Sequence, residues 1–191
     1  RQLAKGMPLG LGFGMSAAKF VSAAKILAGL DLDFDDCKRH VETYRRTNPL
    51  VVALWNRLGD AFEKRHGKPH YVLKLPSGRA IHYWEPSCDG DMSCATEKGG
   101  TRYAVHPGLL AENYTQATAR DLLADAWLRC ADAGIRIVLS VHDELVAECP
   151  AADAPAVKAE MERIMRTPPA WPMAERIPLD VEARVAPRYG K

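Results

Sequence analysis

The sequence predicts an α+β fold, and three observations carry this prediction. Residues 1–70 hold apolar side chains at helical spacing. After residue 70 the period changes, and short β-branched runs alternate with further helical stretches. The chain contains no internal repeat, which excludes a solenoid architecture. An apolar content of 47% and a charged content of 26% exclude a collagen-like, low-complexity or wholly disordered protein.

Three helices are expected before the period changes. The first covers residues 1–30 and contains a proline and three glycines as weak points: Pro8, Gly10, Gly12 and Gly14. Acidic capping residues at 31–36 open the second helix, 34–46. Asn48 and Pro49 end that helix and begin the third, 50–66, which Gly67 terminates.

Two β-hairpins are expected after residue 70. Residues 71–75 and 79–84 are predicted strands on either side of a Pro-Ser-Gly turn. Residues 135–141 and 145–149 are apolar and β-branched, and they predict two buried strands that flank His142, Asp143 and Glu144.

The segments between and after the hairpins complete the expected fold. Residues 86–101 are rich in Gly, Ser, Asp and Lys, which predicts a mobile loop. A long helix is expected over residues 109–133, a surface helix over 151–166 and a final strand over 178–185.

Length and composition limit the class of protein. A chain of 191 residues fits one domain or two small lobes. Lys19 and Lys25 interrupt the longest apolar stretch, so no membrane span is expected. Five cysteines without a CxxC pair predict a reduced, intracellular protein. The chain has no signal peptide and does not begin with Met, so we expect a fragment or processed product.

Charge and cysteine spacing each leave two interpretations open. Residues 1–70 carry 12 Lys and Arg against 7 Asp and Glu, whereas residues 71–191 carry 14 against 17. This division suits a phosphate-holding element beside a metal-holding one, and chance scatter explains it equally well. Cys88 and Cys94 can be interpreted as ends of a metal loop, although a second ligand cluster is missing from the sequence.

The second hairpin carries unusual residues at its tip. Tight hairpin turns favour Asn-Gly or Asp-Gly, whereas this turn offers the imidazole of His142 and the carboxylates of Asp143 and Glu144. Carboxylates on a rigid hairpin are suitable ligands for Mg²⁺, which shares its coordination shell with substrate phosphates. The tripeptide alone favours the alternative, an ordinary exposed turn.

The first predicted helix carries a second pattern. Arg1, Lys5, Leu9 and Phe13 recur every four residues and therefore share one helical face. Two cations followed by an apolar and an aromatic side chain could hold a triphosphate at one end and a base and sugar at the other. In isolation, a solvated Arg/Lys pair followed by two core residues is the favoured interpretation.

Taken together, these two segments resemble the family A DNA polymerases, which are related to bacterial DNA polymerase I. The family pattern Arg-x3-Lys-x7-(Tyr/Phe)-Gly corresponds to Arg1, Lys5, Phe13 and Gly14, and the family's Val-His-Asp-Glu motif corresponds to residues 141–144. Residues 112–121 resemble the Gln-containing helix that precedes this hairpin. The sequences of this helix and of the hairpin are most similar to those of bacteriophage and prophage polymerases. The resemblance covers nearly the whole chain.

The resemblance implies metal and DNA contacts in the second half of the chain. Asp143 would be a ligand of two catalytic Mg²⁺ ions, and Glu144 would support the same site. His142 would lie near the primer 3′ end, and Gln116 would reach the minor groove near the primer terminus.

The resemblance also implies nucleotide contacts in the first half. Lys5 would act catalytically on the dNTP phosphates, with Arg1 beside it on the outer phosphates. Phe13 would lie against the nascent base pair and Leu9 near the sugar. Leu9 stands where better-known members carry Phe or Tyr, and Phe13 replaces the commoner Tyr.

On this resemblance, residues 1–105 are the C-terminal part of the polymerase fingers and residues 106–191 the C-terminal half of the palm. The family's other metal-binding Asp lies upstream of the first helix. We therefore expect the chain to be the C-terminal part of a DNA-directed DNA polymerase. It would act on primer-template DNA and dNTP together with an N-terminal polymerase fragment or subunit. Without that partner the chain would be nearly inert. We expect the protein to be located in the cytoplasm, without membrane association. If it is phage-encoded, this would be the cytoplasm of a bacterial host. The alternatives are a catalytically inactive DNA- or nucleotide-binding fragment and, on the hairpin tip alone, a metal-dependent phosphohydrolase.

Overall fold

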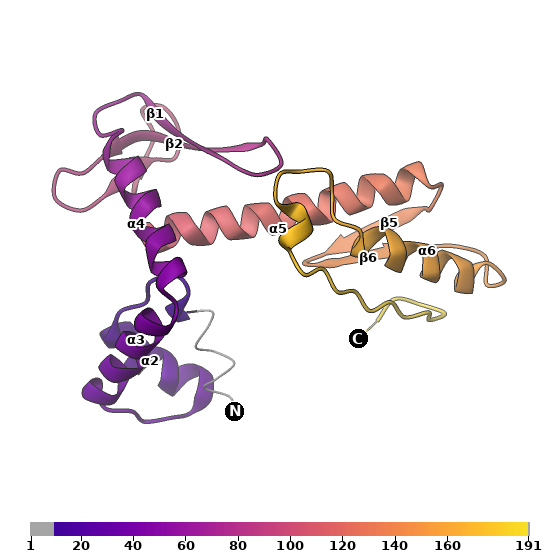
Figure 1. Cartoon of the computed structure of the whole chain (residues 1–191), viewed down its shortest axis with the longest axis horizontal. Coiled ribbons are helices and arrows are strands. Elements are labelled where there is room, and N and C mark those ends of the chain that lie inside the picture. Colours follow the sequence, from indigo (N-terminus) through magenta and orange to yellow (C-terminus); the bar gives the residue numbers. More distant parts are fainter. Residues whose placement is uncertain (1–9, 191) are drawn as a thin grey trace. The chain divides into compact units, whose positions relative to one another are not determined.

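The computed structural model describes residues 10–190 and divides them into two compact units. Unit 1 contains residues 10–73 and 80–115, and unit 2 contains residues 74–79 and 116–190. The long helix α5, Pro107–Asp132, contributes residues to both units (Figure 1). Helices combined with antiparallel sheets confirm the α+β class.

Unit 1 begins with helices whose ends follow capping rules. Helix α2 spans Ala17–Ala28, α3 spans Phe34–Thr47 and α4 spans Pro49–Glu63. The Asp33 side chain accepts a hydrogen bond from the Asp36 backbone N–H, so the predicted acidic cap of α3 is confirmed. Pro49 occupies the first turn of α4, where its missing N–H leaves no partner unsatisfied.

The prediction of one continuous helix over residues 1–30 is wrong within the described residues. Residues 12–14 form a turn, in which Gly14 adopts a φ of 81°. Ser16 then begins a new helix by accepting a hydrogen bond from the Lys19 backbone N–H. The left-handed glycine ends one helix, and the serine caps the start of the next. These two local effects outweigh the apolar periodicity that predicted a continuous helix.

Unit 1 also contains an antiparallel sheet with the strand order β1-β2-β3-β4. The strands are β1 His70–Lys74, β2 Ala80–Ser87, β3 Ser93–Ala95 and β4 Arg102–Ala104. The first predicted hairpin is therefore confirmed, whereas the mobile loop predicted over residues 86–101 is wrong. Strands of three residues are too short to produce a detectable period, and the Arg102 guanidinium holds this region by donating to the Ser93 and Glu85 carbonyls.

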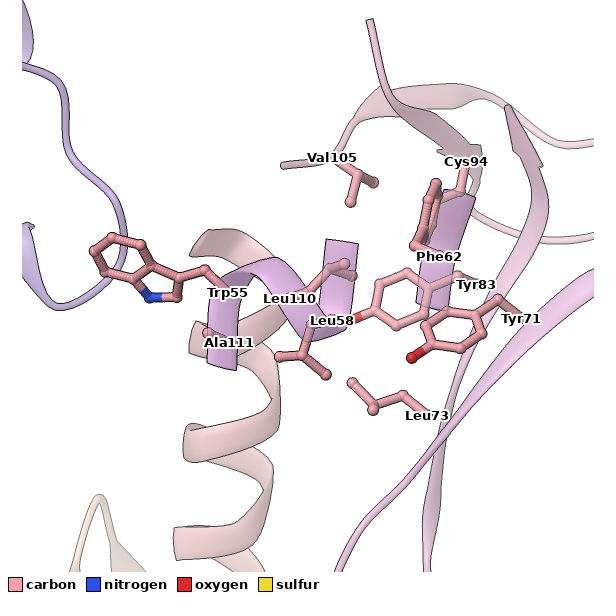
Figure 2. Packing of buried hydrophobic residues seen from close by; sticks show 10 residues of the cluster. All are labelled: Trp55, Leu58, Phe62, Tyr71, Leu73, Tyr83, Cys94, Val105, Leu110 and Ala111. Carbon is pink, nitrogen blue, oxygen red and sulfur yellow. The ribbon is translucent and has the colours of Figure 1, made fainter. Parts of the chain in front are cut away.

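Aromatic rings fill the core of unit 1 between α4 and the sheet (Figure 2). Phe62 is fully buried and meets Tyr71 and Tyr83 edge-on, with ring centroids 5.8 Å and 6.1 Å apart. Leu110 brings the first turns of α5 into the same core. The Tyr83 hydroxyl accepts a hydrogen bond from the Asn113 amide, which satisfies the polar end of a buried ring.

Unit 2 consists of the second hairpin, the later turns of α5 and helix α6, Ala154–Arg166. Strands β5, Ile137–Val141, and β6, Glu144–Ala147, pair antiparallel as predicted. The prediction that both strands are buried is wrong, because Val138 and Leu139 remain 48% and 42% exposed. Only one face of the hairpin packs, mainly against Cys130, Met161 and Ile164.

The final strand predicted over residues 178–185 is also wrong. This segment has no regular secondary structure and joins no sheet. Side chains of α6 bind its backbone instead: Arg166 donates to the Val181 carbonyl, and Glu162 accepts from the Ala183 N–H. Alternating apolar residues form a strand only where a neighbouring edge offers partners. Among residues 10–190, no helix has the length and apolarity that crossing a membrane requires.

Candidate functional site

The tip of the β5–β6 hairpin is a two-residue loop. Val141 pairs with Glu144, so that His142 and Asp143 alone connect the strands. His142 adopts a φ of 51°, a left-handed conformation that glycine would adopt without strain. A non-glycine residue there costs about 1–2 kcal/mol. Residues held in sparsely populated backbone conformations cluster at functional sites, which makes this loop a candidate.

The two carboxylates of the tip differ in their surroundings. His142, Asp143 and Glu144 are all exposed. Asp143 makes no hydrogen bond or ion pair with any other residue in the range 10–190. Glu144 Oε2 accepts a hydrogen bond of 3.2 Å from the hydroxyl of Tyr189, a residue that sequence reasoning did not single out.

The chemistry of this tip fits a hard divalent cation. Residues 10–190 contain no group of three or more His, Cys, Asp or Glu side chains that could hold a metal ion, and this includes the loop between Cys88 and Cys94. Mg²⁺ in phosphoryl-transfer sites is bound by one or two carboxylates, with substrate phosphates and water completing its shell. Asp143 and Glu144 supply that number of carboxylates.

Gln116 lies on the exposed surface of α5, at the start of the part of the helix that belongs to unit 2. A polar cluster holds the helix immediately beyond it. Asp121 is the buried carboxylate of this cluster, and it accepts hydrogen bonds from the Ser77 hydroxyl and from Arg79 Nε. Arg79 also donates to the Ala117 carbonyl at 3.2 Å. Sequence reasoning missed all three of these side chains, because no local pattern pairs residues this far apart.

Of the predicted nucleotide contacts, Arg1, Lys5 and Leu9 lie outside the described residues. Phe13 lies in the turn of unit 1, and the Trp55 indole fixes this turn by donating a hydrogen bond of 3.0 Å to the Gly12 carbonyl. Gly108 lies against the same turn, where an added Cβ would collide with the Phe13 carbonyl group. Trp55 and Gly108 were not foreseen, since each acts on the backbone of a distant segment.

The start of α5, next to Gly108, depends on a histidine. His106 Nδ1 accepts a hydrogen bond of 3.1 Å from the Leu109 N–H, and the His106 carbonyl accepts from Leu110. Burial and, secondly, the positive charge of Lys19 lower the pKa of His106, while Glu112 opposes this shift. A neutral imidazole is the form that can accept the capping hydrogen bond.

A cavity of about 760 Å³ lies at the other end of the hairpin, where Ile135, Arg136 and Glu148 contribute to its lining. None of the predicted site residues lines it. The cavity therefore does not coincide with the hairpin tip.

Comparison with known proteins decides the family. The family model described as DNA polymerase family A matches residues 1–191, which is the whole chain. The chain belongs to DNA polymerase family A. The resemblance that the two motifs carried is thereby confirmed.

Curated relatives of this family A chain are named as DNA polymerases. The DNA polymerase of Bacillus phage SP02 is 29% identical over the whole chain, which covers 33% of that protein. DNA polymerase I of Aquifex aeolicus is 27% identical, and the chain covers 30% of it. DNA polymerase I of Helicobacter pylori strain 26695 is 26% identical, with 19% covered. The chain thus spans between a fifth and a third of the length of these relatives.

A solved structure supports the family A fold. The polymerase domain of Pol1 from M. smegmatis, determined in complex with a DNA primer-template and dNTP, matches 94% of this chain with a TM-score of 0.58. Sequence identity is 21%, and the match covers 28% of that protein chain. This likeness supports the fold alone.

Proposed function

We propose that this chain is the C-terminal part of a DNA-directed DNA polymerase, which transfers a nucleotide from dNTP to a primer 3′-hydroxyl. One observation carries the proposal: a strained two-residue loop presents adjacent exposed carboxylates, Asp143 and Glu144, in a member of a polymerase family. The curated relatives are named DNA polymerase and DNA polymerase I, which supports this class of reaction.

The hairpin tip supplies the metal ligands in this proposal. Asp143 is exposed and makes no hydrogen bond or ion pair with the other described side chains, so its carboxylate is available to a cation. Glu144 stands beside it, with one oxygen oriented by the Tyr189 hydroxyl. Bound Mg²⁺ ions supply charge neutralisation at the entering and leaving oxygens of the transfer. In this proposal His142, on the same loop, lies near the primer 3′ end.

The remaining predicted residues bind the substrates. Arg1 and Lys5 hold the dNTP phosphates, and Lys5 also stabilises the charge that develops during transfer. Leu9 and Phe13 contact the sugar and the nascent base pair. Gln116 donates to the DNA minor groove from the exposed side of α5. In this assignment residues 1–105 are fingers and residues 106–191 are palm.

Activity depends on an N-terminal polymerase part that carries a second catalytic Asp. The chain spans 19–33% of the relatives compared above, so most of a full polymerase corresponds to residues that this chain does not include. Mg²⁺ held by Asp143 and Glu144 alone would lack the opposing carboxylate. We therefore expect the isolated chain to be nearly inert.

Primer extension with Mg²⁺ tests the proposal. The chain is assayed alone and then with the upstream part of the Bacillus phage SP02 polymerase added in trans, after association of the two has been shown by gel filtration. Synthesis in the mixture and almost none with the chain alone supports the proposal. Robust synthesis by the chain alone contradicts the partner requirement. An associated but inactive mixture that still binds primer-template favours a DNA-binding role without catalysis.

A further inference from the structure

The last described residues of unit 2 return to the tip of the β5–β6 hairpin. Tyr189, which is half exposed, donates its hydroxyl hydrogen bond to Glu144 Oε2 across 45 positions of sequence. The Arg184 guanidinium donates to the Gly190 carbonyl at 2.8 Å, which closes the residues between them into a loop. A folded-back segment therefore makes the contact with Glu144.

Two side chains of α6 hold the start of this segment. Arg166 donates to the Val181 carbonyl, and Glu162, one helical turn earlier, accepts a hydrogen bond of 3.0 Å from the Ala183 N–H. Later residues of the segment meet earlier residues of the helix, so the two run antiparallel (Figure 1). We call residues 181–190 the C-terminal strap.

Helix α6 also packs against the hairpin whose tip the strap reaches. Met161 and Ile164 of α6 share an apolar cluster with Leu145 and Ala147 of β6. Glu144 is the first residue of β6. Its backbone is therefore fixed by the hairpin, and its carboxylate is bound by a strap that the same helix holds.

The contact between Tyr189 and Glu144 orients a carboxylate without adding positive charge. A hydroxyl donates one hydrogen bond, whereas an Arg or Lys donor would compete with a metal ion for the same oxygens. Side chains that hydrogen-bond to a metal ligand fix its orientation. Their loss typically weakens metal binding or activity about 10- to 100-fold.

We propose that the C-terminal strap sets the metal affinity of the hairpin tip, with Tyr189 and Arg184 as positioning residues. Tyr189 holds the Glu144 carboxylate beside Asp143, and Arg184 holds the backbone next to Tyr189. The inference rests on the proposed function, because it requires that Asp143 and Glu144 bind a divalent cation. It goes beyond that function by assigning control of the metal site to residues 181–190.

Mn²⁺ binding to the chain alone tests the inference without any enzymatic activity. Mn²⁺ accepts the same oxygen ligands as Mg²⁺, and its paramagnetic resonance signal measures the free ion. The binding that Asp143→Asn abolishes is the binding at the tip. Tyr189→Phe keeps the ring and removes the hydroxyl. It should weaken binding at the tip about three- to tenfold, below the usual range because the contact is exposed.

Arg184→Ala produces an effect of opposite sign to that of its charge. Removing a positive charge favours a cation elsewhere on the chain, whereas loosening the strap disfavours it. Arg184→Ala should weaken Mn²⁺ binding about two- to fivefold, the effect of losing one hydrogen bond. It should have no further effect in the Tyr189→Phe chain, because both changes act through one hydroxyl.

Arg188→Ala is the charge-matched control. Arg188 is an exposed residue of the same strap and makes no hydrogen bond or ion pair with the rest of residues 10–190. Its loss should leave the Mn²⁺ affinity unchanged or slightly higher.

The reconstituted mixture separates metal affinity from the rate of transfer. In primer extension, Tyr189→Phe should raise the half-saturating Mg²⁺ concentration by the factor found for Mn²⁺. At saturating Mg²⁺ the rate should stay within about twofold of that of the unaltered chain. A general loss of structure would lower this rate as well.

The outcomes distinguish the inference from the proposed function. Unchanged Mn²⁺ affinity in Tyr189→Phe, beside a clear loss in Asp143→Asn, would overturn the inference and leave the proposed function standing. Mn²⁺ binding that Asp143→Asn does not reduce would contradict the proposed metal site, and the inference with it. Tighter binding in Arg184→Ala, or additive losses in the double variant, would overturn the role given to Arg184.

Discussion

Arg79 Nε and Asp121 Oδ1 lie 2.7 Å apart, although 42 positions separate the two residues in the sequence. The Asp121 side chain is only 10% exposed, whereas that of Arg79 is half exposed. Ser77 donates to the second carboxylate oxygen, so this largely buried group is satisfied on both sides. The cluster fastens the β1–β2 turn to α5 next to Ala117, within the helix that presents Gln116.

Replacing Asp121 should loosen this attachment. Asp121→Ala removes the acceptor of two side-chain donors and should cost about 1–3 kcal/mol of unfolding free energy. Urea unfolding measures the loss, and amide hydrogen exchange should be faster at residues 77–79. Glu148→Ala is the matched control, because the Glu148–Arg136 pair is exposed on both sides and its loss should change stability by at most about 0.5 kcal/mol. Equal losses in the two variants would contradict the role given to Asp121.

The aromatic core of unit 1 should depend strongly on Phe62. Phe62→Ala removes a fully buried ring that two tyrosines contact, and about 3–5 kcal/mol of stability should be lost. Leu50→Ala on the same helix alters a side chain that is 85% exposed and should change stability by less than about 0.5 kcal/mol. Thermal unfolding of both variants distinguishes the two sites. A Phe62→Ala melting curve that matches the curve of Leu50→Ala would contradict the observed packing.

Gly108 should be intolerant of a methyl group. Alanine normally stabilises a helix relative to glycine by about 1 kcal/mol. Here the added Cβ would collide with the Phe13 carbonyl, so Gly108→Ala should destabilise by about 1–3 kcal/mol and shift the fluorescence of Trp55. Gly190→Ala, at a position with open space around it, should be neutral. A stabilised Gly108→Ala variant would show that the turn at Phe13 does not rest on α5.

The cap of α5 should make stability depend on pH. Because folding lowers the pKa of His106, the unfolded chain binds its proton more readily. The contribution of this group is fully present above its unfolded pKa of about 6.5 and is lost as pH falls below that value. Urea unfolding at pH 7.5, 6.5 and 5.5 measures the trend. His106→Asn keeps a capping acceptor without titrating and should reduce the slope, and an identical slope in this variant would contradict the assignment.

The sequence was sufficient to predict features that depend only on residues close together in the chain. The acidic cap at Asp33, the Pro49 helix start and the hairpin turn at His142 and Asp143 all lie where local patterns predicted them. Glu144, which was predicted to belong to the turn, begins strand β6 instead. The sequence also indicated the family to which the chain belongs, because two motifs in the right order resembled one group of enzymes. Local chemistry and motif order can both be read without knowledge of tertiary contacts.

Other features depend on partners that are distant in sequence, and the sequence could not predict them. Gly14 adopts a left-handed conformation that periodicity does not reveal, so the helix expected over residues 1–30 is interrupted. Residues 178–185 have strand-like composition, but no sheet edge pairs with them. Gly108 and Asp121 gain their importance from contacts with Phe13 and Arg79, far away along the chain. Tertiary contacts override local preference at each of these positions.

The central claim is that the Asp143 carboxylate carries metal-dependent nucleotide transfer, and single-turnover primer extension in the reconstituted mixture tests it most directly. Asp143→Asn preserves the size of the side chain and removes its charge, and Glu148→Gln removes a charge from an exposed acid at the other end of the hairpin. The account predicts that Asp143→Asn lowers the rate at least about 100-fold, with primer-template affinity unchanged, and that Glu148→Gln keeps the full rate. A rate in Asp143→Asn close to that of Glu148→Gln would contradict the claim.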